Sequence, residues 1–374
     1  MRVGIDVSPL VPGRTGVGNY VYYLLKYMLE QEDGIEFSGL AVTRSRVDLA
    51  GLPAANLPVK HIRMPTRLMY ALWNRSALFP VERLVGDVDL YHGTNFYLPP
   101  ARSAKLALTI HDLSFMVHPQ YSSPKIVGPF SKRVRRFSQR ADLILVYSEA
   151  TRADLERLLD VPRDKIVAAP MAVDDCLAPV ERDRARAEVG RRWGLHNPYI
   201  LFVGMLEPRK NIPSILRAFD AIRDTVNHDL VLAGDKGWEC REIFRLVDEL
   251  GLRDRARFIG FVPHTELAPL YSAADAFVFP SFYEGFGLPP LEAMKCGCPV
   301  VAADNSSMPE VLGDAALLVS ADDWHALAST MENVLTNERL RSDLITRGLN
   351  RVQSFSWRRC AEQTIAAYRR IVEG

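Results

Sequence analysis

The chain has 374 residues, of which 48% are hydrophobic and 24% charged, and its formal net charge is +1. At roughly 150 residues per domain this length predicts two or three domains, and the apolar content excludes disordered, collagen-like and small disulfide-scaffold proteins. The small net charge argues against a dedicated nucleic-acid binder. The five cysteines form no Cys-x-x-Cys pair, so neither a zinc site nor a disulfide framework is indicated and a reducing compartment fits best.

No export or membrane-crossing segment is predicted. The apolar stretch at residues 3–7 is too short for a signal-peptide core. No run of about 18 apolar residues occurs elsewhere in the sequence. We therefore expect a cytoplasmic protein.

Short strand-like runs alternate with longer segments of helical periodicity along the whole chain. The runs lie at 2–7, 36–42, 88–92, 105–110, 142–147 and 165–169 in the first half, and at 199–203, 229–233, 256–260, 276–280, 299–302 and 315–319 in the second. Most lack polar alternation, which is typical of strands buried on both faces of a parallel sheet. Helical patterns lie between them, as at 18–31, 148–160, 211–226, 238–250 and 323–336. The alternation predicts an α/β protein with two doubly wound, Rossmann-like parallel-sheet domains.

The junction between the two domains is expected at 170–190. Pro170 and Pro179 interrupt the pattern there, and a short charged segment follows them. We predict a first domain over 1–180 and a second over 190–355. A final helix over 356–374 begins after Ser356, a suitable N-cap residue.

Positive charge is concentrated in residues 101–140. Eight basic side chains face one acid, Asp112, which gives this segment a net charge of +7; they are Arg102, Lys105, Lys125, Lys132, Arg133, Arg135, Arg136 and Arg140. A solvated helix face would explain the pattern. A surface for anionic lipid headgroups or an anionic acceptor would explain it equally well.

A glycine-containing turn, Gly13-Arg14-Thr15-Gly16-Val17-Gly18, follows the first predicted strand. Glycines permit a tight turn and close backbone approach, and the helix that follows offers free N–H groups to an anion. The pattern lacks the third glycine of the dinucleotide fingerprint. An anion-binding turn and a simple strand-to-helix turn both remain open.

Two histidines follow predicted strands of the first domain. His111-Asp112 comes after the run at 105–110, and His92 lies at the end of the run at 88–92. Ligands bind at the carboxyl ends of strands in open α/β sheets, so His111 is a candidate site residue and His92 a weaker one. A hydrogen-bonded structural histidine is the other interpretation. No Asp-x-Asp follows a suitable strand, so we expect no divalent ion that holds a diphosphate.

Two basic residues, Arg209 and Lys210, follow the first strand of the second domain and open a helix. Cations at a helix N-terminus oppose the helix dipole and are mildly unfavourable unless an anion binds there. Phosphate oxygens are suitable anions. A solvated basic turn is the alternative.

The strongest motif is Glu284-Gly285-Phe286-Gly287-Leu288-Pro289-Pro290-Leu291-Glu292, directly after a predicted strand. The glycines make a tight loop, and the prolines suit a first helical turn. Backbone N–H groups around residues 285–288 would therefore point to whatever Glu284 and Glu292 flank. Amides for phosphate and carboxylates for hydroxyls suit a sugar diphosphate.

The spacing of Glu284 and Glu292 resembles the signature of retaining glycosyltransferases of family 4. Residues 296–302, Pro309-Glu310-Val311, residues 258–262, the Pro-Arg-Lys-Asn turn, Ile-His-Asp-Leu and the N-terminal glycine turn continue the likeness over nearly the whole chain. The resemblance implies the GT-B fold, in which two Rossmann-like domains face an inter-domain cleft and the last helix crosses back to the first domain.

The resemblance also implies a role for each matched residue. Glu292 would bind the nucleotide ribose, and Glu284 would face the donor sugar. Arg209 and Lys210 would neutralise the leaving diphosphate, and His111 would reach the transferred sugar. Gly16 would lie beside the diphosphate, and the backbone of residues 261–262 and 285–287 would meet the base, the sugar hydroxyls and the distal phosphate. The remaining donor-binding positions would be Gly16, Gly18, Phe261, Val262, Gly285, Phe286, Gly287 and Leu288. Many family members carry Arg where this chain has Met205, and Arg209 could replace it.

By this resemblance the chain is expected to move mannose from GDP-mannose, with retention and without a metal or other cofactor. The acceptor is expected to be a saccharide or lipid-linked saccharide of cell-surface polysaccharide synthesis, at the inner membrane face. A UDP-glucose or UDP-N-acetylhexosamine enzyme, an epimerase of the same fold and a nucleotide-sugar-binding protein without turnover are the alternatives. The glycine pattern argues against a dehydrogenase.

Overall fold

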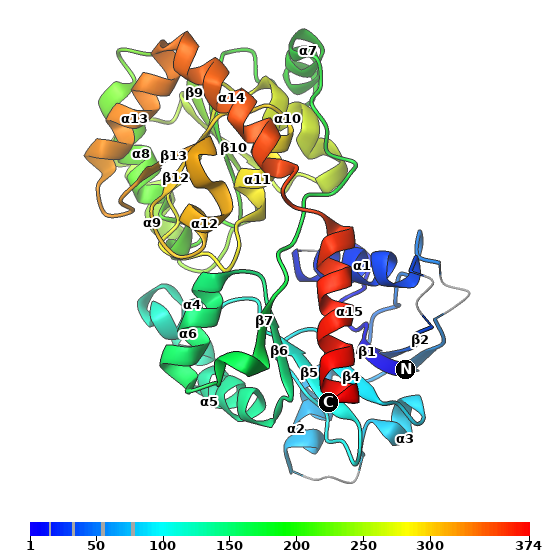
Figure 1. Cartoon of the computed structure of the whole chain (residues 1–374). Coiled ribbons are helices and arrows are strands. Elements are labelled where there is room, and N and C mark those ends of the chain that lie inside the picture. Colours follow the sequence, from blue (N-terminus) through cyan, green and yellow to red (C-terminus); the bar gives the residue numbers. More distant parts are fainter. Residues whose placement is uncertain (15, 32–33, 54–56, 76–78) are drawn as a thin grey trace. The chain divides into compact units, whose positions relative to one another are not determined.

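The computed structural model describes residues 1–14, 16–31, 34–53, 57–75 and 79–374 (Figure 1). They form two compact units. Unit 1 comprises Met1–Met116, Gly128–Met171 and Ser356–Gly374, and unit 2 comprises Val117–Val127 and Ala172–Phe355. The predicted junction at 170–190 contains the boundary after Met171, whereas Val117–Val127 groups with unit 2 although the sequence places it within the first domain.

The sheet of unit 1 has seven parallel strands in the order β3-β2-β1-β4-β5-β6-β7. They are β1 (Arg2–Asp6), β2 (Glu36–Val42), β3 (Val59–Ile62), β4 (Leu90–Gly93), β5 (Lys105–Thr109), β6 (Leu143–Val146) and β7 (Ile166–Ala168). Strand β3 was not predicted. It lies at the sheet edge, has only four residues and exposes Lys60, so its sequence lacks the apolar run of a buried strand.

Helices connect these strands. They are α1 (Gly16–Leu29), α2 (Thr66–Arg75), α3 (Glu82–Val85), α4 (Ser114–Val117), α5 (Pro124–Arg140) and α6 (Glu149–Leu159), with short 3-10 turns at Pro119–Tyr121 and Arg163–Lys165. Part of the turn after β1 cannot be described, because Thr15 lies outside the described residues.

The last helix, α15 (Trp357–Glu373), belongs to unit 1 and lies beside α1 (Figure 1). Ser356 caps it as predicted, since its Oγ accepts the Arg359 N–H at 3.5 Å. Trp357 stacks on Tyr23 of α1 with ring centroids 5.3 Å apart. This apolar contact attaches the end of the chain to its beginning.

The sheet of unit 2 has six parallel strands in the order β10-β9-β8-β11-β12-β13. They are β8 (Tyr199–Val203), β9 (Asp229–Ala233), β10 (Ala256–Gly260), β11 (Ala276–Phe279), β12 (Val300–Ala303) and β13 (Ala316–Val319). Each lies within a residue or so of its predicted range. Most of their side chains are buried, which is why the runs lack polar alternation.

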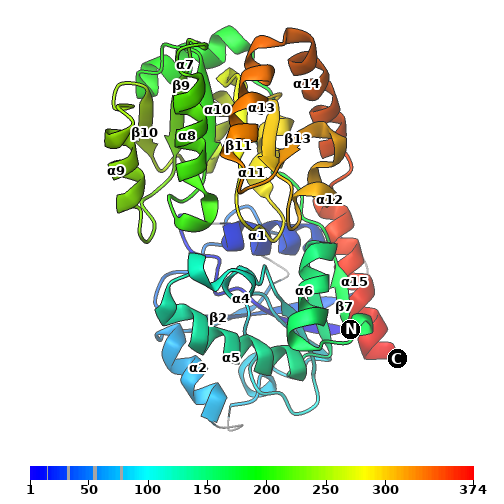
Figure 2. The ribbon, with the colours of Figure 1, turned by 90° about the vertical axis from the view of Figure 1, so that its left-hand side faces the viewer.

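Helices cover both faces of the second sheet, and α8 and α13 lie side by side (Figure 2). The helices are α7 (Arg182–Trp193), α8 (Ile212–Ile222), α9 (Arg241–Glu249), α10 (Leu267–Ala273), α11 (Leu288–Lys295), α12 (Met308–Leu312), α13 (Trp324–Thr336) and α14 (Glu338–Val352), with 3-10 turns at Pro208–Lys210, His264–Glu266 and Gly313–Ala315. Among the described residues, no helix is both long and apolar enough to cross a lipid bilayer.

Both sheets reverse their strand order at one point, between β1 and β4 in unit 1 and between β8 and β11 in unit 2. Connections leave in opposite directions there, so the loops at the carboxyl ends of these strands diverge and open a crevice for ligands. In unit 2 these loops carry the Arg-Lys turn after β8 and the Glu-Gly loop after β11.

Candidate functional site

In unit 2 the loop after β8 and the loop after β11 meet through a buried ionic cluster. The Lys210 Nζ donates to Glu284 Oε1 at 2.6 Å. The Arg209 Nη1 lies 3.1 Å from the same oxygen and donates to the Tyr283 carbonyl at 2.7 Å, while its Nη2 donates to Glu207 Oε1 at 2.8 Å. Three of the predicted site residues thus come together, although 74 positions separate Lys210 from Glu284.

The cluster keeps Glu284 ionised. Burial alone would raise the pKa of this carboxyl, but the Arg209 and Lys210 cations overcome burial and hold the pKa at about 2. Burial, followed by the neighbouring Arg209, lowers the pKa of the Lys210 ammonium, and Glu284 opposes that change. An ammonium has three N–H donors, and Glu284 accepts one of them. Lys210 can therefore still donate to a bound anion.

Side chains from the loop after β12 hold the Glu-Gly loop in place. The Ser307 hydroxyl donates to the carbonyls of Glu284 and Phe286, each at 3.0 Å. The Ser306 Oγ accepts the Glu284 N–H at 3.0 Å. Sequence reasoning did not identify these serines, because nothing in their local pattern shows which distant loop they contact.

The loop conformation requires glycine at position 287. Gly287 has a φ of +95°, and a Cβ there would lie 2.2 Å from the Met308 Cε. It directly precedes α11, and Pro289 and Pro290 lie in the first turn of that helix, as the sequence predicted. The Phe286 side chain is buried against Phe355, with ring centroids 5.6 Å apart, so only its backbone can serve a ligand.

The second glutamate, Glu292, is buried on α11 and already has two protein partners. The Tyr271 hydroxyl donates to its Oε2 at 2.9 Å, and the His264 Nε2 lies 3.3 Å from its Oε1. These contacts orient the carboxylate. Neither partner was identified from the sequence, because a lone tyrosine and a lone histidine in unrelated segments carry no motif.

A pocket of about 640 Å³ lies at the carboxyl ends of β9 and β10. It is lined by Leu206, Gly234, Asp235, Lys236, Phe244, Phe258 and Gly260. Phe261, which comes directly after β10, is 61% exposed, whereas Val262 is buried. Met205, which comes directly after Gly204 beyond the end of β8, is 52% exposed.

The two glycines at the start of α1 in unit 1, Gly16 and Gly18, have different environments. Gly18 is buried in α1, and a Cβ there would lie 2.8 Å from the Pro9 carbonyl oxygen, so packing alone requires this glycine. Gly16 is exposed at the start of α1, and a Cβ there would meet nothing within 4 Å. Of the two, Gly16 fits a position that a ligand could approach.

The two histidines of unit 1 have different environments. His92 is fully buried between Thr109 Oγ1 and Tyr368 Oη, each 2.7 Å from a ring nitrogen, and burial lowers its pKa to about 3. It is therefore a structural residue. The His111 Nδ1 lies 2.5 Å from Tyr147 Oη, while its buried Nε2 has no hydrogen-bond partner among the described residues. Burial lowers the pKa of His111 to about 4, so the ring is neutral near pH 7.

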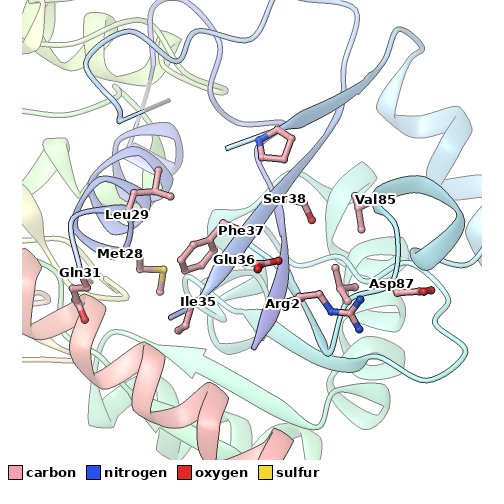
Figure 3. Close-up of a pocket in the computed structure, with 12 residues that line it drawn as sticks. Arg2, Met28, Leu29, Gln31, Ile35, Glu36, Phe37, Ser38, Val85 and Asp87 are labelled. Atoms are coloured by element: carbon pink, nitrogen blue, oxygen red, sulfur yellow. The ribbon is translucent and has the colours of Figure 1, made fainter. Parts of the chain in front are cut away.

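A separate pocket of about 540 Å³ in unit 1 contains none of the predicted site residues (Figure 3). It is lined by residues at the amino ends of β1 and β2, such as Arg2 and Glu36, and by Met28 and Leu29 of α1. Ligands of open α/β sheets bind at the opposite, carboxyl edge. We therefore do not assign this pocket to the candidate functional site.

Two family models match the chain: "Glycosyltransferase Family 4" over residues 14–177 and "Glycosyl transferases group 1" over residues 185–351. The O-antigen chain mannosyltransferase B of Escherichia coli is 37% identical over 282 residues, which cover 75% of this chain and 74% of that protein. The chain therefore belongs to glycosyltransferase family 4. The family resemblance of the sequence is thereby confirmed.

Solved structures of other proteins are similar to this glycosyltransferase over nearly its whole length. Sucrose-phosphate synthase from Thermosynechococcus elongatus is similar with a TM-score of 0.80 and 24% identity, over 99% of this chain and 98% of that one. Anabaena HepE in complex with UDP and glucose has a TM-score of 0.74 and 16% identity, over 98% of each chain. They confirm the predicted GT-B fold class with its two parallel-sheet α/β domains.

Proposed function

We propose that this glycosyltransferase moves mannose from GDP-mannose to a saccharide or lipid-linked saccharide acceptor in cell-surface polysaccharide synthesis. The main support for sugar transfer is the Arg209–Lys210–Glu284 cluster between the loops after β8 and β11 of unit 2. The choice of mannose rests on the likeness to an O-antigen chain mannosyltransferase over three quarters of the chain. The chemistry and the donor can be tested separately.

The cluster suits departure of a nucleoside diphosphate. Breaking the bond between sugar and phosphate leaves negative charge on the diphosphate, which preorganised cations stabilise most effectively in a site that excludes water. Lys210 is the stronger candidate for this role, because it keeps donors in excess of its contact with Glu284. Arg209 contacts Glu207, Tyr283 and Glu284, so it also holds the two loops together.

The transfer is proposed to be retaining and independent of metal. The departing diphosphate accepts the proton of the acceptor hydroxyl on the same face of the sugar. Glu284 is paired with two cations, and we propose for it no role as the nucleophile of a double displacement. Turnover should therefore persist with excess chelator; its complete loss, with recovery on addition of magnesium or manganese, would contradict the proposal.

The two glutamates are proposed to act on different parts of the donor. Glu292 accepts hydrogen bonds from the ribose, and Glu292→Gln replaces a charged acceptor by a neutral one of the same shape. Hydrogen bonds to charged groups are worth roughly 1.5–3 kcal/mol, so GDP affinity should fall about 10- to 100-fold. Glu284 faces the sugar, which GDP lacks, so Glu284→Gln should reduce turnover more than GDP affinity.

Calorimetry with GDP and turnover at saturating donor distinguish the two roles. Equal loss of GDP affinity in both variants would show that this division of roles is wrong. Calorimetry of the unmodified protein with UDP tests the donor. Tighter binding of UDP than of GDP would favour a UDP-sugar donor, such as the UDP-glucose enzyme that the sequence left open.

The chain is proposed to contact the inner membrane face through the basic segment at 101–140, whose helix α5 supplies most of the basic side chains. Lys132, Arg135 and Arg136 of α5 are exposed, whereas Arg140 donates to the Pro99 carbonyl at 2.9 Å. The side chain of Lys125 lies outside the described residues. Near an anionic membrane each basic side chain contributes about 1 kcal/mol, which salt reduces. Equal sedimentation with phosphatidylglycerol and phosphatidylcholine vesicles would refute this contact.

A further inference from the structure

Asp174, Cys176 and His264 converge in unit 2 from two segments far apart in the sequence. Asp174 and Cys176 lie in the loop before α7, and His264 opens the 3-10 turn after β10. One ligand atom from each residue lies within 4.8 Å of the other two. The His264 Nδ1 is 3.4 Å from Asp174 Oδ2 and 3.7 Å from Cys176 Sγ.

Two of the three separations between the ligand atoms match the edges of a tetrahedral zinc site. Zinc binds sulfur at about 2.3 Å, imidazole nitrogen at about 2.0–2.1 Å and carboxylate oxygen at about 2.0–2.2 Å. At the tetrahedral angle these bonds place nitrogen and oxygen about 3.4 Å apart, and nitrogen and sulfur about 3.6 Å apart. The distances from His264 Nδ1 to Asp174 Oδ2 and to Cys176 Sγ, 3.4 Å and 3.7 Å, are close to these values.

The surrounding contacts hold the three residues in this geometry. Asp174 Oδ1 accepts the Cys176 N–H at 2.9 Å, while Oδ2 faces His264. The Lys295 Nζ donates to the Asp174 carbonyl oxygen at 2.9 Å, which fixes the loop. On its other side the His264 ring contacts buried Glu292, with Nε2 3.3 Å from Oε1. A metal-bound histidine usually donates its second N–H to such a carboxylate.

We propose that Asp174, Cys176 and His264 bind a Zn²⁺ ion, with the fourth position left to water. Cys176 is exposed, which provides an entry path from solvent. A cysteine binds zinc as the thiolate, so the ion displaces the Cys176 thiol proton when it binds. The spacing rules that indicated no zinc site from the sequence cannot detect ligands 88 positions apart.

Titration of tag-free, metal-depleted protein with Co²⁺ tests the site, because cobalt coordinates like zinc and absorbs in the near ultraviolet when bound to thiolate. We expect saturation at one equivalent, and displacement of the band by Zn²⁺. Cys176→Ser should abolish the band. His264→Asn removes a proposed ligand and should weaken binding at least as much as loss of an outer-shell partner does, which is about 10-fold. Cys240→Ser is the matched control, because Cys240 is a partly exposed cysteine outside the cluster.

The proposal is overturned if the unmodified protein shows no saturable thiolate band, or if the band persists in Cys176→Ser. Circular dichroism confirms that each variant is folded. A further consequence rests on the proposed ribose role of Glu292. A bound ion fixes His264 with its Nε2–H toward Glu292, so GDP affinity should differ between zinc-loaded and metal-depleted protein. In Cys176→Ser the two GDP affinities should be equal. Equal affinities in the unmodified protein would refute this coupling, whereas the cobalt titration tests the metal site independently of it.

Discussion

Glu284→Gln removes one negative charge from a cluster that holds two cations. The side chains of Glu284 and Lys210 are each only 10% exposed, and their charged atoms lie 2.6 Å apart. The pKa of Glu284 is about 2 in the folded protein against an ordinary value of 4.5. At about 1.4 kcal/mol per pH unit, this difference corresponds to about 3 kcal/mol of folding stability at neutral pH. Breaking a buried ion pair typically costs a similar amount, about 3–5 kcal/mol.

The pH dependence follows from the direction of the pKa change. Because the pKa of Glu284 is lower in the folded than in the unfolded chain, its contribution is complete above about pH 4.5 and is lost as the pH falls toward about 2. We therefore expect Glu284→Gln to lower the free energy of unfolding by about 3 kcal/mol at pH 7. Below pH 4.5 the gap between the two proteins should narrow.

Urea unfolding followed by circular dichroism, at pH 7 and in steps below pH 4.5, measures both effects. Glu338→Gln is the matched control, because the Glu338 side chain is 93% exposed and its replacement should change stability little. A Glu284→Gln protein as stable as the control at pH 7 would refute the electrostatic argument. So would a gap that stays constant as the pH is lowered through 4.5.

Three further predictions concern positions in both units. Gly287→Ala should lower the free energy of unfolding by about 1–3 kcal/mol, because φ is +95° and the new Cβ would collide with Met308. Gly16→Ala is the control: its Cβ meets nothing within 4 Å, so thermal stability should be unchanged. Tyr368→Phe removes the hydrogen bond to buried His92 and should cost about 1–3 kcal/mol in the same assay. Because burial lowers the pKa of His111 to about 4, the pH profile of turnover should show no ionisation of this residue near pH 6.5, and His111→Gln should lower turnover without changing the shape of the profile above pH 5.

Most of the fold could be predicted from the sequence because buried parallel strands are nearly continuous apolar runs. Strand β3 is the exception, since an edge strand with exposed Lys60 needs no such run. The grouping of Val117–Val127 with unit 2 could not be predicted either. It depends on contacts such as that of Tyr121 with Phe282, whose stacked rings lie 4.2 Å apart.

The site was predictable where local motifs carry it. The order of strands explains why the loops after β8 and β11 meet, and so why Lys210 and Glu284 can pair. That Glu284 is itself the partner of both cations could not be inferred from spacing. The contacts of Glu292 with Tyr271 and His264 are likewise tertiary, and no single-sequence pattern encodes them.

The position of α15 in unit 1 has a consequence for folding during synthesis. At about 5–20 residues per second, a ribosome needs roughly 10–40 s to translate unit 2 and the last helix after residue 171. Throughout that interval unit 1 lacks the helix that supplies Trp357 against Tyr23 and Tyr368 against His92. The nascent chain therefore exposes an apolar face of its first domain until residues 356–374 have been synthesised, and we expect a chaperone to bind that face during this interval.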